Sequence, residues 1–310
     1  MNKIYFWAND TKKNSGEGIL ALNFLNLLKK KFKNHKFINL NRFKKKNNLF
    51  YNYFTPFFGV ILIWKYYFQG KKICYINYLP IWNFLIFLFL PKKTILGPIT
   101  GTITKKNIIY KLLKKVGIYV LKNKKKNLFS HNQFIIEFTD NKHNYFNFLF
   151  YKFKINFKPT KKKFDLVFYF KRNNNKGNYF LINLIRNIPK ELKVAVIGDK
   201  LNISKKNIKN FGTLSREKAL KIISLSKYAL SSKENHFSFF VLDCLSKGLF
   251  IFYNKDLKFY NDIKTNMFLP IDFNNMRYSI KNINEKLFKN KIQKKIFKIK
   301  LRNFNKYLAS

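Results

Sequence analysis

The sequence has little cysteine, glycine and proline. Two cysteines, Cys74 and Cys244, are too few for a four-ligand zinc site or a scaffold held by disulfides, and they indicate a reducing compartment. Glycine (11) and proline (7) are scarce, whereas Lys, Asn, Ile, Phe and Tyr, the residues of A/T-rich codons, are abundant. The apolar fraction of 47%, with 37 Phe and 18 Tyr, excludes a disordered chain. At 310 residues the chain is long enough for two domains, each with its own core.

The sequence also lacks an apolar run of the roughly 20 residues that a membrane-spanning helix needs. Two apolar stretches, 54–68 and 79–91, are shorter than that, and proline, glycine, lysine or asparagine interrupts or bounds them. We predict that they are helices of a globular domain, with partial contact with a bilayer surface as the alternative. The first 18 residues have no continuous apolar segment, so we expect no signal peptide and a cytoplasmic protein.

Acidic residues are few: 14 Asp and Glu stand against 63 Lys and Arg, which gives a formal net charge of +49. The lysines form short clusters, for example at 44–46, 124–126 and 161–163, rather than one basic tail. Codon bias with a solvated basic surface is one explanation, and attraction to an anionic membrane surface is another. None of the clusters lies in a nucleic-acid-binding motif, so we expect no specific nucleic acid partner.

Strand-like and helix-like segments alternate along the chain. We predict strands over 3–8, 36–40, 72–77 and 93–97, and a first helix on which Ile19, Leu22, Leu25 and Leu28 share one face. The pattern breaks at the basic stretch 151–163 and then restarts, with strands over 165–170, 193–199, 228–232 and 249–254 and helices over 179–187 and 215–226. This alternation predicts α/β architecture in two domains, with ligands at the carboxyl ends of parallel strands.

The stretch 231–248, SSKENHFSFFVLDCLSKG, combines two acids with a short apolar helix pattern. Ser238 is placed to cap a helix that runs to Lys247, and Gly248 is placed to end it in the left-handed conformation. Glu234 then lies in the preceding loop, and Asp243 lies inside the helix. The free N–H groups of a helix N-terminus suit a phosphate, and flanking acids suit sugar hydroxyls.

The second half of the sequence resembles the donor-binding domain of retaining GT-B glycosyltransferases of family 4, the "glycosyl transferases group 1". Their motif S-x-x-E-G-F-G-x-x-x-x-E-A-x-A-x-G is similar to SSKENHFSFFVLDCLSKG, with Asp243 at the second acid. FYFKRNNNKGNYFLINLI resembles the G-R-x-x-x-x-K-G segment, and VAVIGD and NFGTLSREKALKIIS resemble the strand and helix that follow it. In the first half, NSGEGILALNFL resembles the family's glycine loop and first helix, and ILGPITG resembles a G-P-x-G-G segment.

This resemblance implies a GT-B architecture, in which two Rossmann-like domains face each other across a cleft. Residues 1–155 would form the acceptor-side domain, 164–285 the nucleotide-sugar-binding domain, and 286–310 a C-terminal helix that packs back across the junction. The implied activity is transfer of a sugar from a nucleotide-sugar donor to an acceptor hydroxyl with retention. Bacterial enzymes of this kind build cell-surface polysaccharide or lipopolysaccharide, which implies a glycan or lipid-linked acceptor and peripheral attachment to the inner face of the cytoplasmic membrane.

The resemblance also implies which residues form the site. Glu234, Arg172 and Lys176 would be catalytic, because positive groups are needed at the leaving diphosphate. The basic partner of Lys176 is either Lys171 or Arg172, and the first acid position of the motif is filled by either Glu234 or Asn235. The residues expected to bind the donor are Gly16, Lys171, Arg172, Lys176, Glu234, Asn235, Phe237, Ser238 and Asp243.

No metal and no cofactor are expected, because the sequence has no acidic pair of the Asp-x-Asp type in a suitable place and the nucleotide-sugar is a substrate. Two alternatives remain open at this point. The protein is either a glycosyltransferase-like fold without activity, or a basic anion-binding module attached to membrane or RNA.

Overall fold

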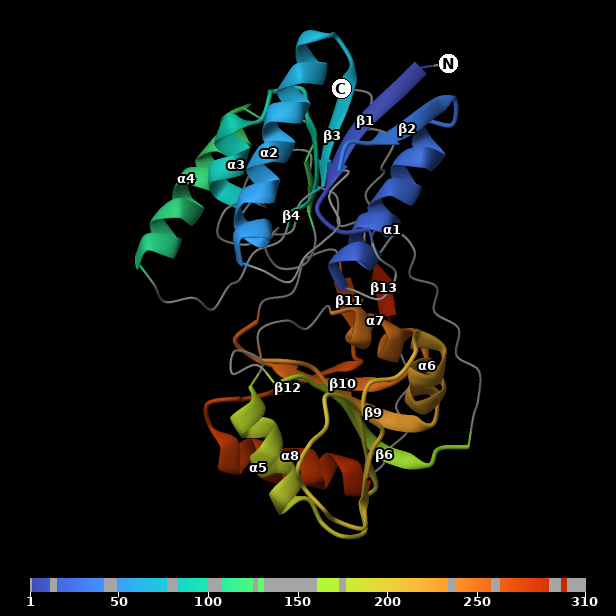
Figure 1. Ribbon diagram of the computed structural model, residues 1–310. Helices are drawn as coiled ribbons and strands as arrows, with labels where there is room; N and C mark the ends of the chain where they lie inside the picture. The colour runs from blue at the N-terminus through green and yellow to red at the C-terminus, as the bar shows by residue number, and fades with distance from the viewer. Residues whose placement is uncertain are drawn as a thin grey trace. The chain divides into compact units, whose positions relative to one another are not determined.

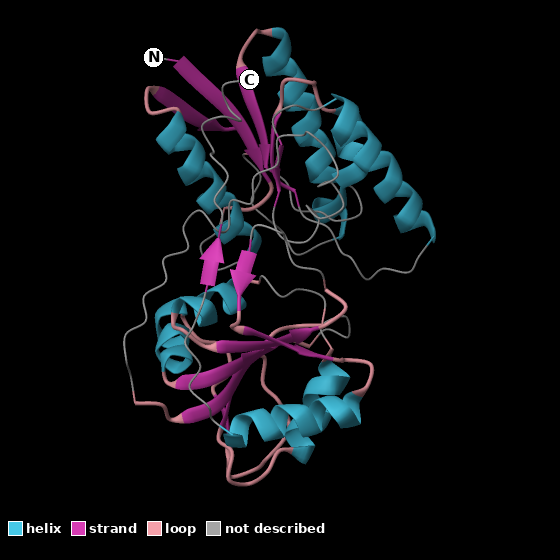
Figure 2. Cartoon of the chain, turned by 180° about the vertical axis from the view of Figure 1, so that it is seen from behind, coloured by secondary structure: helices cyan, strands magenta, loops and turns pink. Residues whose placement is uncertain are grey.

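The structure is a computed structural model that describes residues 2–11, 16–41, 49–76, 83–99, 108–124, 128–130, 161–172, 177–233, 238–257, 263–289 and 297–299. These residues divide into two compact units, a first unit before residue 152 and a second unit within 152–301. Each unit contains one extended parallel sheet with helices packed on it (Figures 1 and 2). The α/β fold with two parallel sheets is therefore confirmed, whereas the domain limits 1–155, 164–285 and 286–310 stay a prediction.

The first unit is a five-stranded parallel sheet in the order β2-β1-β3-β4-β5. Its strand order reverses at β1 and β3, the kind of position at which α/β sheets bind ligands. The buried central strands are nearly continuous apolar runs because both of their faces are covered. The elements are β1 Asn2–Ala8, α1 Gly16–Lys31, β2 His35–Asn39, α2 Leu49–Phe68, β3 Lys72–Ile76, α3 Asn83–Phe89, β4 Ile95–Ile99, α4 Ile108–Lys124 and β5 Leu128–Ser130.

Helices α2, α3 and α4 cover one face of this sheet, and α1 covers the other (Figure 1). The stretches 54–68 and 79–91 contribute to α2 and α3, so the described parts of both are helical, as predicted. Helix α2 lies close to the sheet at Gly59, because a side chain at this position would overlap the indole ring of the fully buried Trp7. One turn earlier, the Pro56 carbonyl accepts a hydrogen bond of 2.7 Å from the Tyr75 hydroxyl.

The buried face of α1 differs in part from the predicted one. Leu25 and Leu28 are buried as expected, but Ile19 and Leu22 are only partly buried. The residues that α1 buries most completely are Leu20, Phe24, Leu27 and Leu28. The helix is apolar around much of its circumference, so periodicity alone did not define which face packs on the sheet.

We predict that Gly59→Ala destabilises the first unit. Alanine favours a helix over glycine by about 1 kcal/mol, but overpacking against an immobile ring costs about 1–3 kcal/mol. Urea unfolding should therefore give a free energy of unfolding up to about 2 kcal/mol below that of the wild type. The paired variants Trp7→Leu and Trp7→Leu/Gly59→Ala form the control. The second substitution should cost less in the Trp7→Leu background, and equal costs in both backgrounds would contradict the proposed overlap.

The second unit is a six-stranded parallel sheet in the order β12-β10-β9-β6-β7-β8. Numbered along the chain, this is the order 3-2-1-4-5-6 of dinucleotide-binding Rossmann sheets, read from β8. The elements of this unit are β6 Phe164–Phe170, α5 Asn178–Asn187, β7 Val194–Gly198, β8 Ile208–Asn210, α6 Arg216–Ser224, β9 Ser226–Leu230, α7 Phe239–Ser246, β10 Phe250–Asn254, β11 Ile263–Thr265, β12 Phe268–Ile271, α8 Met276–Lys289 and β13 Phe297–Ile299.

Helices α5 and α8 lie on one face of this sheet and α6 and α7 on the other (Figure 1). The core that they enclose is apolar, with Leu166, Phe168, Val194, Val196 and Phe252 all fully buried. The predicted strands and helices of this half are confirmed, and their ends differ from the prediction by no more than two residues. Cys74 and Cys244, one in each unit, are buried free thiols.

The end of the chain departs from the expected single helix over 286–310. The described part of this range contains the end of α8 and then β13, which pairs antiparallel with β11. The sequence FKIKL over 297–301 alternates apolar residues with lysine, which is the period of a strand rather than of a helix. The expected packing of this segment across the junction lies outside the described residues.

Candidate functional site

The carboxyl ends of β6 and β9 are adjacent in the second sheet, at the point where its strand order reverses. The loops that follow these strands, 171–177 and 231–238, therefore start side by side. They meet at Gly177, whose φ of 83° lies in the left-handed region. A Cβ added at Gly177 would lie 3.1 Å from the Lys233 Cβ and 3.1 Å from the Phe273 ring. Glycine thus lets the start of α5 approach the loop after β9.

Lys233 connects three loops at this edge of the sheet. Its ammonium group donates a hydrogen bond of 3.0 Å to Asn274 Oδ1, in the loop after β12. Its carbonyl accepts a hydrogen bond of 3.0 Å from Asn254 Nδ2. Asn254 ends β10 and is buried, so its amide holds the β9 loop from beneath. Gly177, Lys233 and Asn254 were not among the site residues predicted from the sequence, although Gly177 is the glycine of the segment that resembles K-G.

Helix α7 begins at the same edge, as predicted. The Ser238 hydroxyl caps it by accepting a hydrogen bond of 3.3 Å from the Val241 N–H. Gly248 follows the helix with a φ of 74°, the left-handed conformation expected for it. The remaining free N–H groups of the first turn and the helix dipole make this end of α7 favourable for an anion. Glu234, Asn235 and Phe237, all predicted site residues, lie outside the described residues, as does Lys176.

Asp243 lies in the second turn of α7 and forms an ion pair with Arg216. The distance from Arg216 Nη2 to Asp243 Oδ1 is 2.7 Å, and 19% of the Asp243 side chain is exposed. Burial raises the pKa of Asp243 to about 6, although Arg216 and Lys247 act to lower it. The carboxylate is thus held in a poorly solvated position beside a cation at the start of α6.

Arg216 was missed by the sequence analysis, although the sequence carries a signal for it. Ser215 caps α6 through the Lys218 N–H, which makes Arg216 the first residue of that helix. A cation at the positive end of a helix dipole is unfavourable unless it has another partner. Asp243 is that partner, and the pair joins the first turn of α6 to α7.

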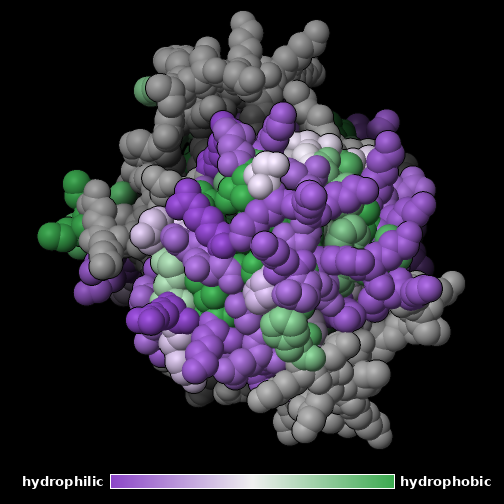
Figure 3. Space-filling model, turned by 90° about the horizontal axis from the view of Figure 1, so that it is seen from below, coloured by the Kyte–Doolittle hydropathy of each residue, from purple (hydrophilic) through white to green (hydrophobic). Residues whose placement is uncertain are grey.

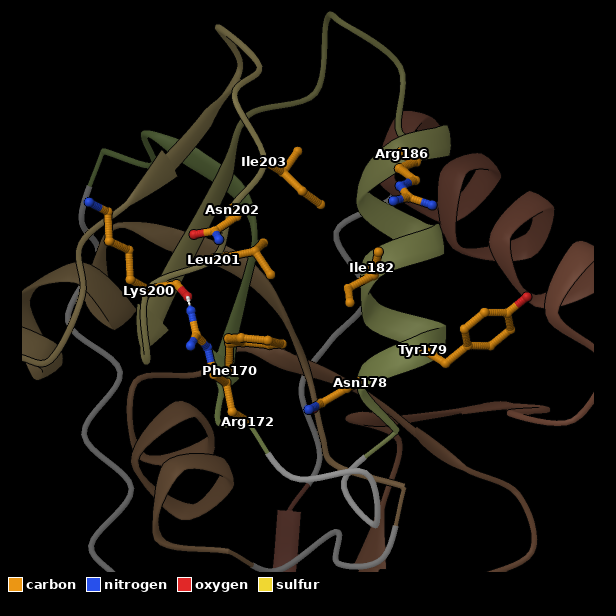
Figure 4. Close-up of a pocket in the computed structure, with 10 residues that line it drawn as sticks. All are labelled: Phe170, Arg172, Asn178, Tyr179, Ile182, Arg186, Lys200, Leu201, Asn202 and Ile203. Carbon is orange, nitrogen blue, oxygen red and sulfur yellow. Dashed lines mark hydrogen bonds between the residues drawn. The ribbon is translucent and has the colours of Figure 1, made fainter.

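Arg172 follows β6 and contacts the loop after β7. Its backbone N–H donates a hydrogen bond of 2.8 Å to Asp199 Oδ2, and its Nη2 donates one of 3.5 Å to the Lys200 carbonyl (Figure 4). Lys171 is exposed. Among the described residues, no hydrogen bond or ion pair joins Arg172 to Ser238 or Asp243. Whether Lys171 or Arg172 is the basic partner of Lys176 stays open.

Arg172 also lines a shallow groove of about 730 Å³ between α5 and the loop after β7 (Figure 4). Three cations line this groove, Arg172, Arg186 and Lys200, and the exposed Tyr179 ring lies at its rim. The Asn178 Oδ1 atom is buried and accepts no hydrogen bond in the described part of the chain. The groove is therefore positively charged and adjoins the loop 171–177. Its other lining residues are Phe170, Ile182, Leu201, Asn202 and Ile203.

Gly16, the predicted donor-contacting residue of the first half, is the first residue of α1. It follows the carboxyl end of β1, where Asn9 and Asp10 are buried. The Asn41 side chain closes this end of the sheet by donating a hydrogen bond of 2.8 Å to the Ala8 carbonyl. Gly16 thus lies at the strand-order reversal of the first sheet.

The structure is similar over nearly its whole length to solved glycosyltransferases. HepE from Anabaena, crystallised in complex with UDP-glucose, matches with a TM-score of 0.56 and 11% identity over 93% of this chain and 90% of HepE. WaaG, a glycosyltransferase involved in lipopolysaccharide biosynthesis, matches with a TM-score of 0.56 and 11% identity over 92% of this chain and 90% of WaaG. A glycosyltransferase from Rickettsia africae matches with a TM-score of 0.52 and 14% identity over 93% of this chain and 88% of that protein.

The fold is that of the GT-B glycosyltransferases. No protein-family model matches the sequence, and no curated protein matches it either. At these identities the likeness establishes the fold, and the roles of single residues depend on the geometry of this chain.

We predict that Asp243 makes the stability of the second unit depend on pH. The folded protein retains a proton on Asp243 between pH 3.8 and about 6, where the unfolded chain has lost it. Stability therefore falls as pH rises through this window, and the cost of the buried charge is fully present above it. Asp243→Asn removes this cost, so its stability relative to the wild type should rise by about 1–2 kcal/mol between about pH 5 and pH 8.

Urea unfolding at these two pH values measures the difference. Arg216→Gln is the paired variant, because loss of the cation should raise the pKa of Asp243 further and steepen the loss of stability. Parallel pH profiles for the wild type and Asp243→Asn would show that the carboxylate is well solvated and that its pKa is not raised.

Proposed function

We propose that the protein is a retaining glycosyltransferase that moves a sugar from a nucleoside diphosphate sugar to an acceptor hydroxyl. The observation that carries this proposal is the meeting of the loops after β6 and β9 at Gly177 and Lys233, with the start of α7 beside them. Open α/β sheets bind ligands at the carboxyl ends of their strands where the strand order reverses, and HepE, whose fold is similar, was crystallised with UDP-glucose.

The donor diphosphate would lie against the starts of α5 and α7. Both helices begin at the carboxyl edge of the sheet, and their free N–H groups and dipoles stabilise the negative charge that builds up on the leaving diphosphate. Lys176, with either Lys171 or Arg172, would supply the remaining positive charge from the loop after β6. Because these groups suffice to neutralise a diphosphate, the proposal needs neither a metal nor a cofactor.

Asp243 would bind the two ribose hydroxyls of the donor nucleotide. Arg216 Nη2 lies 2.7 Å from Asp243 Oδ1. The cation would therefore orient the carboxylate and leave Oδ2 to accept hydrogen bonds from the ribose. An ionised carboxylate accepts hydrogen bonds from a vicinal diol, and its poor solvation strengthens those bonds. Glu234 or Asn235 would contact the hexose, with Phe237 and Ser238 completing the donor site.

Gly16, at the start of α1, would contribute from the first unit. We propose a glycan or lipid-linked acceptor and a role in the synthesis of cell-surface polysaccharide or lipopolysaccharide. Supporting this, WaaG, which matches over 92% of this chain, is described as acting in lipopolysaccharide biosynthesis. A GT-B fold that binds the donor without transferring it is the competing function, and a turnover assay distinguishes the two.

We expect that a nucleoside diphosphate sugar stabilises the purified protein against heat. Binding raises the melting temperature by mass action, so a panel of nucleotides and nucleotide-sugars should reveal the cognate donor. Asp243→Ala should weaken both the free nucleotide and the nucleotide-sugar by about 10–100-fold, the loss of one charged hydrogen bond. Asp165→Ala is the matched control, since Asp165 pairs with Lys227 at 2.9 Å at the opposite, amino end of the sheet.

Asp165→Ala should keep wild-type affinity. If no ligand of the panel shifts the melting temperature, or if both variants lose affinity equally, the proposed donor site is wrong.

We predict that Glu234→Ala spares nucleotide binding and lowers kcat, because its contact is with the sugar that changes in the transition state. Release of the nucleotide during turnover measures kcat, and the affinity for the free nucleotide is the internal control. The same defect in Asn235→Ala, with Glu234→Ala unaffected, would assign the hexose contact to the amide. Normal turnover in both variants would remove this loop from the mechanism.

A further inference from the structure

Helix α2 presents a regular stripe of exposed apolar side chains. Its buried side packs on β1 and β3 through Pro56, Gly59, Val60 and Ile63. The opposite side exposes large apolar residues at spacings of three, four and seven, which places them in one line along the helix. These residues are Phe54, Phe58, Ile61 and Phe68, of which Ile61 is 64% and Phe68 79% exposed.

Helix α4 carries a second stripe of the same kind. Gly117 and Val120 are buried on its inner side. Its outer side exposes Ile108, Ile109, Leu112, Val116 and Tyr119, with Ile108 80% exposed. The positions 108, 112, 116 and 119 follow the three- and four-residue spacing of one helix face. The stripe is therefore a feature of the whole helix rather than of one residue.

The two stripes belong to the same side of the first unit. Helix α3 packs between α2 and α4, and all three helices lie on one face of the sheet (Figure 1). Helix α3 adds Phe89, which is 56% exposed. We call the exposed residues of these three helices the three-helix face. Apolar side chains that line up over several adjacent helices mark a surface that contacts something other than water.

The charges on the three-helix face are all of one sign. The sequences of α2, α3 and α4 contain no acidic residue. Exposed lysines lie beside the apolar stripes: Lys65 on α2, Lys111 and Lys115 on α4, and Lys92 and Lys93 directly after α3. Two copies of the chain that paired through this face would bring these lysines together, which is unfavourable. A partner with a negatively charged surface and an apolar interior complements both features.

We propose that the three-helix face docks on an anionic lipid bilayer. The lysines would contact the lipid phosphates, and the apolar stripes would enter the boundary between headgroups and acyl chains, as in helices that lie in the membrane plane. In the described part of the chain, no helix is long and apolar enough to cross a membrane. The face thus holds the protein on the surface, and this proposal does not depend on glycosyl transfer.

The second unit offers a contrast. In Figure 3, the side of the molecule seen from below, where α5 and α8 lie, is mostly hydrophilic with small separate hydrophobic areas. Its large exposed apolar residues are few, among them Tyr179, Tyr278 and Phe288. The second unit therefore lacks, among its described residues, a stripe comparable to those of α2 and α4.

The test is co-sedimentation of the full chain with vesicles of phosphatidylcholine, with or without a minority of phosphatidylglycerol. The wild type should bind the anionic vesicles, and high salt should weaken but not abolish this binding because the apolar stripes are insensitive to screening. The variant Lys65→Gln/Lys111→Gln/Lys115→Gln should bind at least about tenfold more weakly. The variant Ile61→Gln/Ile108→Gln/Leu112→Gln should lose at least about tenfold as well, and its exposed positions keep the fold intact.

The matched control is Lys190→Gln/Lys206→Gln/Lys221→Gln, which removes the same charge from exposed positions of the second unit. It should bind like the wild type. Equal losses in both lysine variants would show attraction by net charge alone and overturn the proposal. The proposal also fails if the wild type does not bind anionic vesicles. It fails equally if size-exclusion chromatography shows that the Gln variants of the three-helix face convert a dimer into a monomer.

Discussion

The close contact between the start of α5 and the loop after β9 is the constraint on which the second unit's ligand edge depends. Parallel strands β6 and β9 are neighbours, yet the connections from them leave to opposite faces of the sheet. A side chain at Gly177 would separate the two loops by crowding Lys233 and Phe273. The φ of 83° at Gly177 is also one that L-residues rarely adopt. The positive φ and the lack of space for a Cβ atom therefore both favour glycine at position 177.

Lys233 and Asp243, two charged residues at this edge, have different kinds of partner. The Lys233 ammonium group donates a hydrogen bond to the neutral side chain of Asn274, and the Lys233 carbonyl accepts one from the side chain of Asn254. Asp243 is paired with Arg216 and is still more easily protonated than an ordinary carboxyl, because burial outweighs the attraction of the cation. The Arg216 side chain is 55% exposed, so the pair contributes little to stability, because solvent screens the cation and desolvation of the carboxylate offsets the attraction. The proposed donor site gives the pair another role, because Arg216 would hold the Asp243 carboxylate in a fixed orientation.

Much of the fold follows from local patterns in the sequence. The apolar runs of β6, β7, β9 and β10 are short and bounded by polar residues, so their existence and order were predictable. The caps Ser215 and Ser238 also followed from residue type and position. The local patterns did not show features that depend on tertiary contacts. The buried face of α1 is set by its packing on the sheet, and β13 forms a strand by pairing with β11.

The candidate site was predictable only in part, for a related reason. Asp243 and Ser238 stand out by residue type within a short motif, and the prediction that Ser238 caps a helix containing Asp243 is confirmed. Lys233 and Asn254 are ordinary residues that matter because strands distant in the sequence bring them to one edge. Arg216 is an intermediate case. The sequence shows a cation at the unfavourable, positive end of a helix dipole, but it does not show that the partner is Asp243, 27 residues away.

The net charge of +49 is distributed differently over the ligand edge of the second unit and the three-helix face of the first unit. At the ligand edge, Lys233 is engaged with Asn274 and Arg216 with Asp243, so these two cations have particular partners. On the three-helix face, Lys65, Lys111 and Lys115 stand beside exposed apolar side chains in helices without acids. Codon bias supplies lysine everywhere, but it does not explain why exposed apolar and basic residues lie together on α2 and α4. That placement, rather than the total charge, is the argument for a lipid surface.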